Sequence, residues 1–425
     1  MSADPAVSRP ADGIVDVAVI GAGAAGVGAA RRLAASSLSV LVLEASNRAG
    51  GRAHTLAGRS GAGIDLGCGW LHSADQNPWV ALAESEGFEL DRSRPSWERR
   101  LTGVNMSDVQ AREFGRAFEV FEAKLEAAAA EPDRPAAELF DEITAPWRPM
   151  LDAFSSYYNG ALFRDISVHD YAAYQPTDEN WRVVQGYGAL VAQTAAGLPI
   201  VFKAPVTRID RTGSPLRLAT ATGEVQARMV IVAVPTTILS EDRLAFDPPL
   251  PDHAAAADAL PLGHVDKCFL ALAERAALPV EMMVTGRTTT ADTGSYTLQP
   301  FGRPMIEGFF GGDLAEALEA EPPGAFSAFA IDELAALFGS SLRRALRPIA
   351  ESRWGADPYI RGAYSHARPG QAGARAALRR PVEDRIFFAG EACSAHAFST
   401  CHGAYQTGVE AAETVLAGHA PGGGG

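Results

Sequence analysis

Short apolar runs and longer amphipathic stretches alternate along this chain and predict its main elements. Ile14–Ile20 and Ser39–Leu43 are apolar and rich in β-branched residues, which is typical of strands buried in a parallel sheet. Between them, Val27–Ala35 has the composition and spacing of a helix. Strand, helix and strand in this order predict a βαβ unit at the start of the chain.

The rest of the chain continues this alternation. Apolar or alternating runs separated by Thr-Gly turns predict strands in Val206–Asp210, Pro215–Ala219 and Met229–Val234. Amphipathic stretches at Asn105–Ala130 and Trp147–Ala173 predict helices that cap a binding site. Shorter signals predict strand pieces in Tyr296–Phe310, a helix in Asp332–Leu346, a strand at Arg385–Phe388 and a helix at Gly403–Ala417.

Composition narrows the class of protein. The chain has 425 residues, 47% hydrophobic and 21% charged, which is enough for two or three domains with cores and too hydrophobic for a disordered chain. No apolar run approaches the ~18 residues of a membrane-spanning helix. Lys and Arg are scattered within a net charge of −14, so we expect neither a membrane nor a nucleic acid as partner.

Cysteine usage and the N-terminal lead point to a cytoplasmic protein. The four cysteines lack metal-ligand spacing, so we expect no metal and no disulfide scaffold. A redox pair of Cys393 and Cys401 is conceivable, but their spacing is not C-x-x-C and we expect both to be packed side chains. Met1–Asp12 has neither the basic start nor the apolar core of a signal peptide.

Glycines are concentrated where the chain leaves its first strand. Gly21-Ala22-Gly23-Ala24-Ala25-Gly26 opens the first helix, and Glu44 ends the second strand. In this context G-x-G-x-x-G is a dinucleotide fingerprint: Gly21 permits the turn, Gly23 lets the backbone approach a pyrophosphate, and Gly26 lets the helix pack on the strand. Glu44 is placed to bind a ribose.

The motifs that follow the fingerprint indicate which protein family the chain resembles. Gly50-Gly51-Arg52-Ala53-His54-Thr55 adds a second glycine turn with an arginine, and Gly63–Trp70 follows it. With these motifs the chain resembles the flavin-containing amine oxidases, a family of monoamine oxidases, polyamine oxidases and flavin-dependent histone demethylases. The resemblance covers Ile14–Trp70 and Trp354–Ala417 well. Cys401-His402-Gly403-Ala404-Tyr405 is closest to the polyamine oxidases.

The resemblance implies a mixed α/β fold. A Rossmann-like FAD-binding domain with a βαβ core and β-meander would be interleaved with a substrate-binding domain of mixed sheet and helical cap. We expect the FAD domain at 12–75, 195–260 and 357–420, the substrate domain at 76–194 and 261–356, and flexible tails at 1–11 and 421–425.

The resemblance also implies how FAD is held. Ala363 stands where monoamine oxidases carry the cysteine that bonds the flavin, so we expect noncovalent FAD. The cofactor-binding residues implied are Gly21, Gly23, Ala25, Gly26, Glu44, Ala45, Gly51, Arg52, Gly67, Gly69, Trp70, Val206, Trp354, Gly390, Glu391, Gly408 and Val409.

Three residues are candidates for the chemistry. In the family a lysine at the position of Lys267 holds a water against the flavin, and we expect burial to lower its pKa. Without the resemblance, we would expect Lys267 to lie along the strand with its amine in solvent. Tyr364 matches one wall of the family's aromatic cage, and Thr400 stands at the other. Further candidates for the substrate pocket are His72, Trp181 and His402.

These matches predict oxidation of a polyamine or other aliphatic amine to an imine, which hydrolyses, while O2 becomes H2O2. The expected partners are a small amine and dioxygen, and a homodimer is left open. The alternatives are an L-amino-acid oxidase, for which no arginine clamp is evident, a flavin dehydrogenase or desaturase that reduces a carrier, and a non-catalytic flavoprotein.

Overall fold

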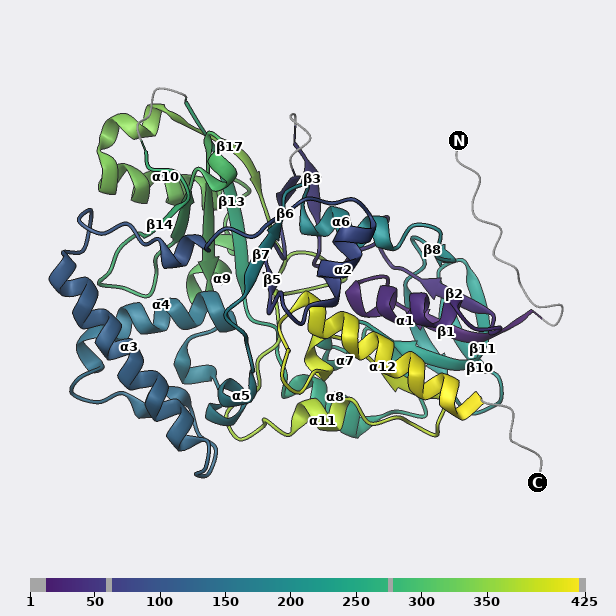
Figure 1. The fold of residues 1–425 in the computed structure, drawn as a ribbon. Helices are drawn as coiled ribbons and strands as arrows, with labels where there is room; N and C mark the ends of the chain where they lie inside the picture. The colour runs from purple at the N-terminus through teal and green to yellow at the C-terminus, as the bar shows by residue number, and fades with distance from the viewer. Residues whose placement is uncertain (1–12, 59–62, 274–277, 420–425) are drawn as a thin grey trace.

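Two sheets organise the chain, each in its own lobe (Figure 1). The computed structural model describes residues 13–58, 63–273 and 278–419. The tails expected at 1–11 and 421–425 lie outside these ranges. Among the described residues no helix is both long and apolar enough to cross a membrane.

The first lobe is built on an eight-stranded sheet. Its order is β12-β9-β10-β11-β1-β2-β8, with β18 pairing to β11. The strands are β1 Ile14–Ile20, β2 Val40–Leu43, β8 Ile200–Val201, β9 Val206–Asp210, β10 Leu216–Thr220, β11 Gly223–Val232, β12 Ala245–Asp247 and β18 Ile386–Phe388.

Strand β11 joins the two parts of this sheet. Its first half pairs antiparallel with β10 in the meander, and its second half pairs parallel with β1 and β18. Both faces of the parallel part are buried in hydrophobic clusters, as its continuous apolar runs predict. The predicted α/β class, with a βαβ core and a β-meander, is therefore confirmed.

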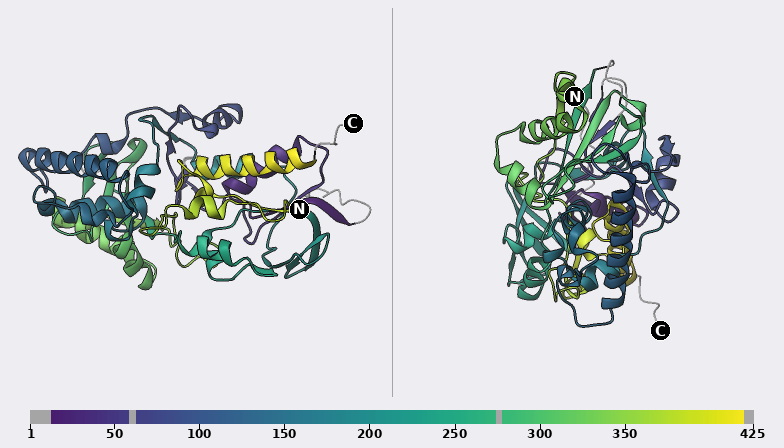
Figure 2. Two further views of the ribbon diagram at one scale, coloured as in Figure 1. Left: turned by 90° about the horizontal axis from the view of Figure 1, so that it is seen from below. Right: turned by 90° about the vertical axis from the view of Figure 1, so that its left-hand side faces the viewer.

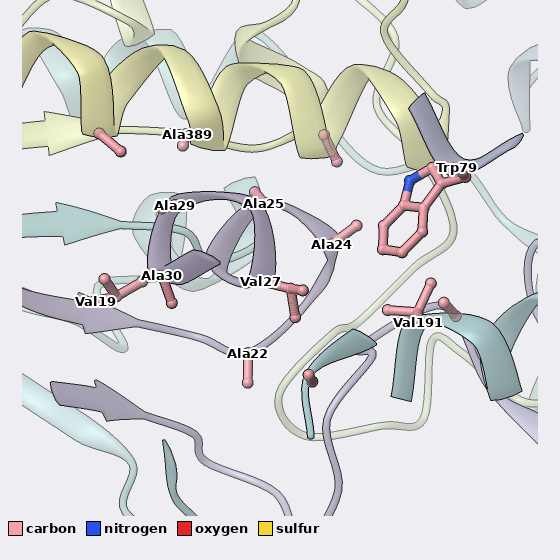
Figure 3. Close-up of a cluster of buried hydrophobic side chains, with 14 of the residues drawn as sticks. Val19, Ala22, Ala24, Ala25, Val27, Ala29, Ala30, Trp79, Val191 and Ala389 are labelled. Atoms are coloured by element: carbon pink, nitrogen blue, oxygen red, sulfur yellow. The ribbon is translucent and has the colours of Figure 1, made fainter. Parts of the chain in front are cut away.

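Helices α1 (Ala24–Ala34) and α12 (Cys401–His419) lie across each other on this sheet (Figure 1). Their contact is very close because both carry glycines there. A Cβ at Gly408 would lie 1.9 Å from the backbone oxygen of Ala25, and one at Gly28 would lie 2.5 Å from that of Tyr405. Figure 3 shows the small side chains of α1 beneath α12, with Trp79 closing one end of the cluster.

The second lobe is an antiparallel sheet in the order β14-β15-β16-β13-β17. One face packs against helices α9 and α10 through buried side chains such as Tyr296, Phe310 and Phe326. The elements are β13 Val265–Leu272, β14 Met282–Thr285, β15 Ser295–Leu298, β16 Met305–Gly311, β17 Leu346–Glu351, α9 Gly312–Ala320 and α10 Ala325–Phe338.

Three helices cap the opposite side of this lobe: α3 (Asp108–Ala128), α4 (Arg148–Asn159) and α5 (Val168–Ala173). An aromatic cluster that includes Phe121 and Phe163 holds them together. In Figure 2 these blue helices and the yellow α12 occupy different ends of the molecule. The predicted helical cap is therefore present.

Several elements complete the connections. They are α2 Pro78–Ser85, α6 Tyr187–Thr194, α7 Thr236–Ser240, α8 Pro251–Asp258, α11 Ala374–Leu378 and the short strands β3 Thr55–Ala57, β4 Gly63–Asp65, β5 Leu71–His72, β6 Leu90–Asp91 and β7 Asn180–Val183.

One predicted element differs. The helix expected over Asp332–Leu346 begins earlier, as α10, and ends at Phe338. Gly339 follows with a φ of +96°, a conformation that favours glycine and stops the helix. Leu346 instead begins strand β17.

Candidate active site

A cavity of about 1360 Å³ extends between the two lobes and collects most of the predicted site residues. Its lining includes Gly21, Gly23, Ala25, Glu44, Ala45, Gly51, Arg52, Gly67, Gly69, Trp70, His72, Val206, Lys267, Trp354, Tyr364, Gly390, Glu391 and Thr400. These residues come from segments far apart in sequence, so only the folded chain brings them to one surface.

Five predicted residues lie outside this lining: Gly26, Trp181, His402, Gly408 and Val409. Two of the glycines serve packing, which for Gly26 is the role that the fingerprint predicts. A Cβ at Gly26 would lie 1.9 Å from the oxygen of Gly21, and Gly408 allows α12 to approach α1. Trp181 stacks with the guanidinium of Arg92 at 4.7 Å. His402 is buried in α12, and burial lowers its pKa to about 4.

The glycine turn opens one end of the cavity toward the N-terminus of α1. Gly23 is the N-cap residue of this helix and has no side chain to satisfy the first N–H groups. A Cβ at Gly23 would meet no atom within 4 Å, so the backbone is open on that side. A helix N-terminus with free N–H groups favours an anion such as a pyrophosphate.

Glu44 fixes the end of β2 beside this turn. Its carboxylate accepts hydrogen bonds from the N–H groups of Ala22 at 2.7 Å and Ser46 at 2.8 Å. Each oxygen keeps further acceptor capacity. Glu44 is buried, and it lines the cavity where a ribose of the dinucleotide would lie.

Arg52 and Glu391 form an ion pair in the middle of the cavity. Nη1 of Arg52 lies 2.8 Å from Oε1 of Glu391, and it also donates to the backbone oxygen of Ala363. Ser365 donates its hydroxyl to the other Glu391 oxygen at 2.6 Å. Burial alone would raise the pKa of Glu391, but Arg52 and Ser365 outweigh it, so the pKa is lowered and the acid is ionised.

A second buried pair supports the first. Arg375 donates to both carboxylate oxygens of Asp170, at 2.6 and 2.8 Å, and to the Ser365 hydroxyl at 2.9 Å. Ser365 therefore links the two pairs. The sequence did not identify Arg375 or Asp170, because neither stands in a motif.

Lys267 enters the other end of the cavity from β13. Its side chain is 7% exposed, and Nζ lies 2.9 Å from Oε1 of Glu307 and 3.2 Å from the backbone oxygen of Asp65. The amine therefore does not reach bulk solvent. A Cβ at Gly69 would lie 3.2 Å from Nζ, so the glycine leaves room for the amine.

The expected pKa of Lys267 was wrong in direction. Burial lowers it, as expected, but Glu307 raises it more, so the pKa of Lys267 lies above its ordinary value. Glu307 belongs to β16 and lies diagonally across from Lys267 in the antiparallel register. An acid within the apolar run Met305–Gly311 was the signal that sequence reasoning missed.

Trp354 closes the cavity next to the glycine turn after β4. Its indole N–H donates to the oxygen of Leu66 at 3.1 Å. A Cβ at Gly67 would lie 3.1 Å from the Trp354 ring and 1.7 Å from the oxygen of Arg52, so only glycine fits there.

Tyr364 and Thr400 both line the cavity, with their hydroxyl groups already engaged. The Tyr364 hydroxyl donates to the backbone oxygen of Tyr157, and burial raises the pKa of Tyr364. Thr400 accepts from the N–H of Gly403 at 3.0 Å and so caps α12. The Tyr364 hydroxyl is therefore already occupied by the backbone, and Thr400 is first of all a helix cap.

Two cysteines meet at this end of the cavity. Cys68 and Cys401 both line it. The neighbouring Cys401 thiol and burial raise the pKa of Cys68 well above its ordinary value. Cys393, the partner considered from the sequence, is buried elsewhere, in the core beside β18.

The residues present fit an extended flavin dinucleotide. An anion site at a helix N-terminus and a ribose-binding acid lie at one end of the cavity, and a buried lysine lies at the other. This arrangement offers a dinucleotide site continuous with a chamber for a substrate.

Comparison with known proteins agrees with this geometry. The family model for flavin containing amine oxidoreductases matches residues 24–162 and 133–416. Polyamine oxidase 2 of Arabidopsis thaliana is 29% identical over 436 residues, which cover 93% of this chain and 87% of that protein. Lysine-specific histone demethylase 1 homolog 2 of the same plant is 28% identical over 94% of this chain, which spans only 58% of that relative.

Solved structures share the fold. A putrescine oxidase bound to putrescine superposes with a TM-score of 0.77 at 22% identity, covering 95% of this chain and 99% of that one. Cyclohexylamine oxidase from Brevibacterium oxydans gives 0.76 at the same identity and coverage. With the family model matching most of its length, this chain belongs to the flavin-containing amine oxidoreductases.

Proposed function

We propose that this protein oxidises an aliphatic amine, with polyamines among the candidates, using noncovalently bound FAD and dioxygen. The observation that carries the proposal is the buried Lys267 in a chamber continuous with the dinucleotide site. Among the matched proteins, the polyamine oxidase and the putrescine oxidase are named for aliphatic amines.

The dinucleotide end would hold FAD through groups that are already fixed. The N-terminus of α1 would bind the pyrophosphate, Glu44 a ribose, and the Arg52–Glu391 pair would lie along the middle of the cofactor. Bound there, FAD would supply a two-electron acceptor for the amine and a donor of those electrons to dioxygen.

The chain's own residues position the amine and control protons. Tyr364 offers a ring face to the approaching amine. Lys267 stays protonated beside Glu307, so its Nζ donates hydrogen bonds to a water and does not accept a proton from the substrate.

The proposed reaction balances. The amine loses two electrons and two protons and becomes an imine, and dioxygen gains both and becomes hydrogen peroxide. Water then cleaves the imine into a carbonyl compound and ammonia or a smaller amine.

Anaerobic mixing with a panel of amines tests the proposal. We expect at least one aliphatic amine to bleach the oxidised flavin spectrum, and peroxide to appear when air is admitted. Bleaching without peroxide would favour the alternative dehydrogenase, and a spectrum unchanged by every amine would refute an oxidase.

The noncovalent link has its own test. Because Ala363 carries no thiol to bond the flavin, acid precipitation should release the yellow cofactor into the supernatant. Colour retained in the washed pellet would contradict this part of the proposal.

A further inference from the structure

The substrate chamber contains an arginine with no acidic partner. Arg100 lines the cavity, and its guanidinium lies over the ring of Phe114, 5.5 Å from the centroid. In the described part of the chain no hydrogen bond or ion pair engages this guanidinium. The ring face satisfies part of the charge but leaves the N–H donors unused.

The register of the sheet locates Arg100 relative to the chemistry. The backbone of Arg100 forms an isolated β-bridge with Met283 of β14. Met283 pairs with Thr297 of β15, and Thr297 pairs with Glu307 of β16. Paired residues share a face, so this row runs across the chamber wall beside Lys267. Arg100 lies four strands from Lys267, about 19 Å between the backbones at ~4.8 Å per strand.

The wall between these two ends is neutral. The second row of the same face is Thr285, Ser295 and Phe309, ending at Lys267. All of its members line the chamber.

The described charged side chains that line the chamber inside its mouth are paired, with the exception of Arg100. Lys267 is neutralised by Glu307 at 2.9 Å, which leaves the Arg100 cation. Two more acids of the lining, Glu98 and Asp178, are exposed at the chamber's mouth, and Glu98 is already paired with Arg94. Among the described charged side chains that line this end of the cavity, Arg100 is therefore the cation without an acidic partner, and its position disfavours an ammonium group and matches one carboxylate.

We propose that the physiological substrate is an amine whose far end carries a carboxylate, held by Arg100 across the chamber. This inference rests on the proposed amine oxidation and narrows its substrate class. An α-amino acid does not satisfy the geometry, since its carboxylate lies beside the reacting carbon and cannot reach the distant strand edge.

A matched substrate series tests the assignment. Alkylamines, ω-aminocarboxylates, α,ω-diamines and α-amino acids of equal carbon number are compared by anaerobic flavin reduction. Calorimetry with analogues that lack a hydrogen on the amine-bearing carbon reports binding without turnover. We expect the ω-aminocarboxylate to bind at least tenfold tighter than the alkylamine, because charge-assisted bidentate hydrogen bonds form.

Variants identify the residue responsible. Arg100→Met should reduce this preference to less than threefold, and Arg100→Lys should retain part of it because the charge remains. Arg112→Met removes an exposed arginine of α3 outside the cavity lining and should keep the full preference.

Three outcomes would overturn the inference: no preference for the far carboxylate, a preference that survives Arg100→Met, or stronger binding of α-amino acids. If the carboxylate analogues bind through Arg100 but no amine reduces the flavin, the anion site stands and the proposed oxidation fails. The two proposals can therefore fail separately.

Discussion

The buried pair of Lys267 and Glu307 makes a prediction that can be worked out from its geometry. At 2.9 Å and an effective dielectric constant of about 20, two unit charges attract by about 6 kcal/mol. Glu307 keeps 24% of its side chain exposed to the cavity, so water screens part of this attraction. We expect Glu307→Gln to lower the free energy of unfolding by about 3 kcal/mol, since it leaves a buried lysine unpaired.

The effect should depend on pH with a definite sign. The folded-state pKa of Lys267 lies above the ordinary value of 10.5, so the pair's contribution is fully present below that pH and is lost as pH rises through the folded pKa. Glu307→Gln removes the largest influence that raises the pKa of Lys267, so burial, which lowers the pKa, is opposed mainly by the smaller effect of Asp65. The variant's penalty should therefore shrink as the pH approaches 10.5.

Urea denaturation in a double-mutant cycle measures this coupling. Glu307→Gln, Lys267→Met and the double variant are compared at about pH 7 and pH 9.5. The double variant should be more stable than the sum of the single effects implies, because both charges are removed together. Glu119→Gln, at an exposed position of α3, serves as the control.

Two results would refute the reasoning. Glu307→Gln within about 0.5 kcal/mol of the parent would mean that the pair contributes nothing measurable. Additive single effects would mean that the two side chains do not interact in solution.

Three further predictions follow from packing and burial. Gly408→Ala should lower the free energy of unfolding by about 1–3 kcal/mol, because the new Cβ would lie 1.9 Å from the α1 backbone. The control Gly418→Ala, whose Cβ would have no atom within 4 Å, should not destabilise the protein. Equal urea midpoints for the two variants would contradict this. Arg375→Met should cost about 3–5 kcal/mol in unfolding free energy by leaving Asp170 buried without its cation; a loss under 1 kcal/mol would show that the acid finds another partner. Burial lowers the pKa of His402 from 6.5 to about 4, so the parent protein loses stability as the pH falls through this window. Between about pH 7 and pH 4.5, the free energy of unfolding of His402→Gln should fall by about 2–3 kcal/mol less than that of the parent. Parallel pH profiles of the two proteins would disprove this.

The cofactor end of the site could be predicted from short sequence motifs. The turn from Gly21 to Gly26 and the acid at Glu44 are contiguous with the strands that hold them, so their geometry follows from short-range sequence. The same holds for Gly67, where backbone lies too close for any side chain. Such positions are determined by sterics that neighbouring residues impose.

Gly408 and Trp181 show the limit of motif matching. Each lies in a segment that contributes to the cavity, but a helix or strand turns only some of its side chains toward it. Gly408 faces α1, and Trp181 faces Arg92. Which side an element presents depends on its packing partners, and these come from elsewhere in the chain.

The sequence by itself determined a mixed α/β fold, a dinucleotide site and a family. Tertiary structure decided the charge state of Lys267, the pairing of Arg52 with Glu391 and the exposure of Arg100 in the substrate chamber. The physical reason is the distance along the chain between the interacting residues. Strand and turn patterns depend on neighbours in sequence, whereas a buried charge depends on the acid or aromatic ring that another strand or helix brings within a few ångströms.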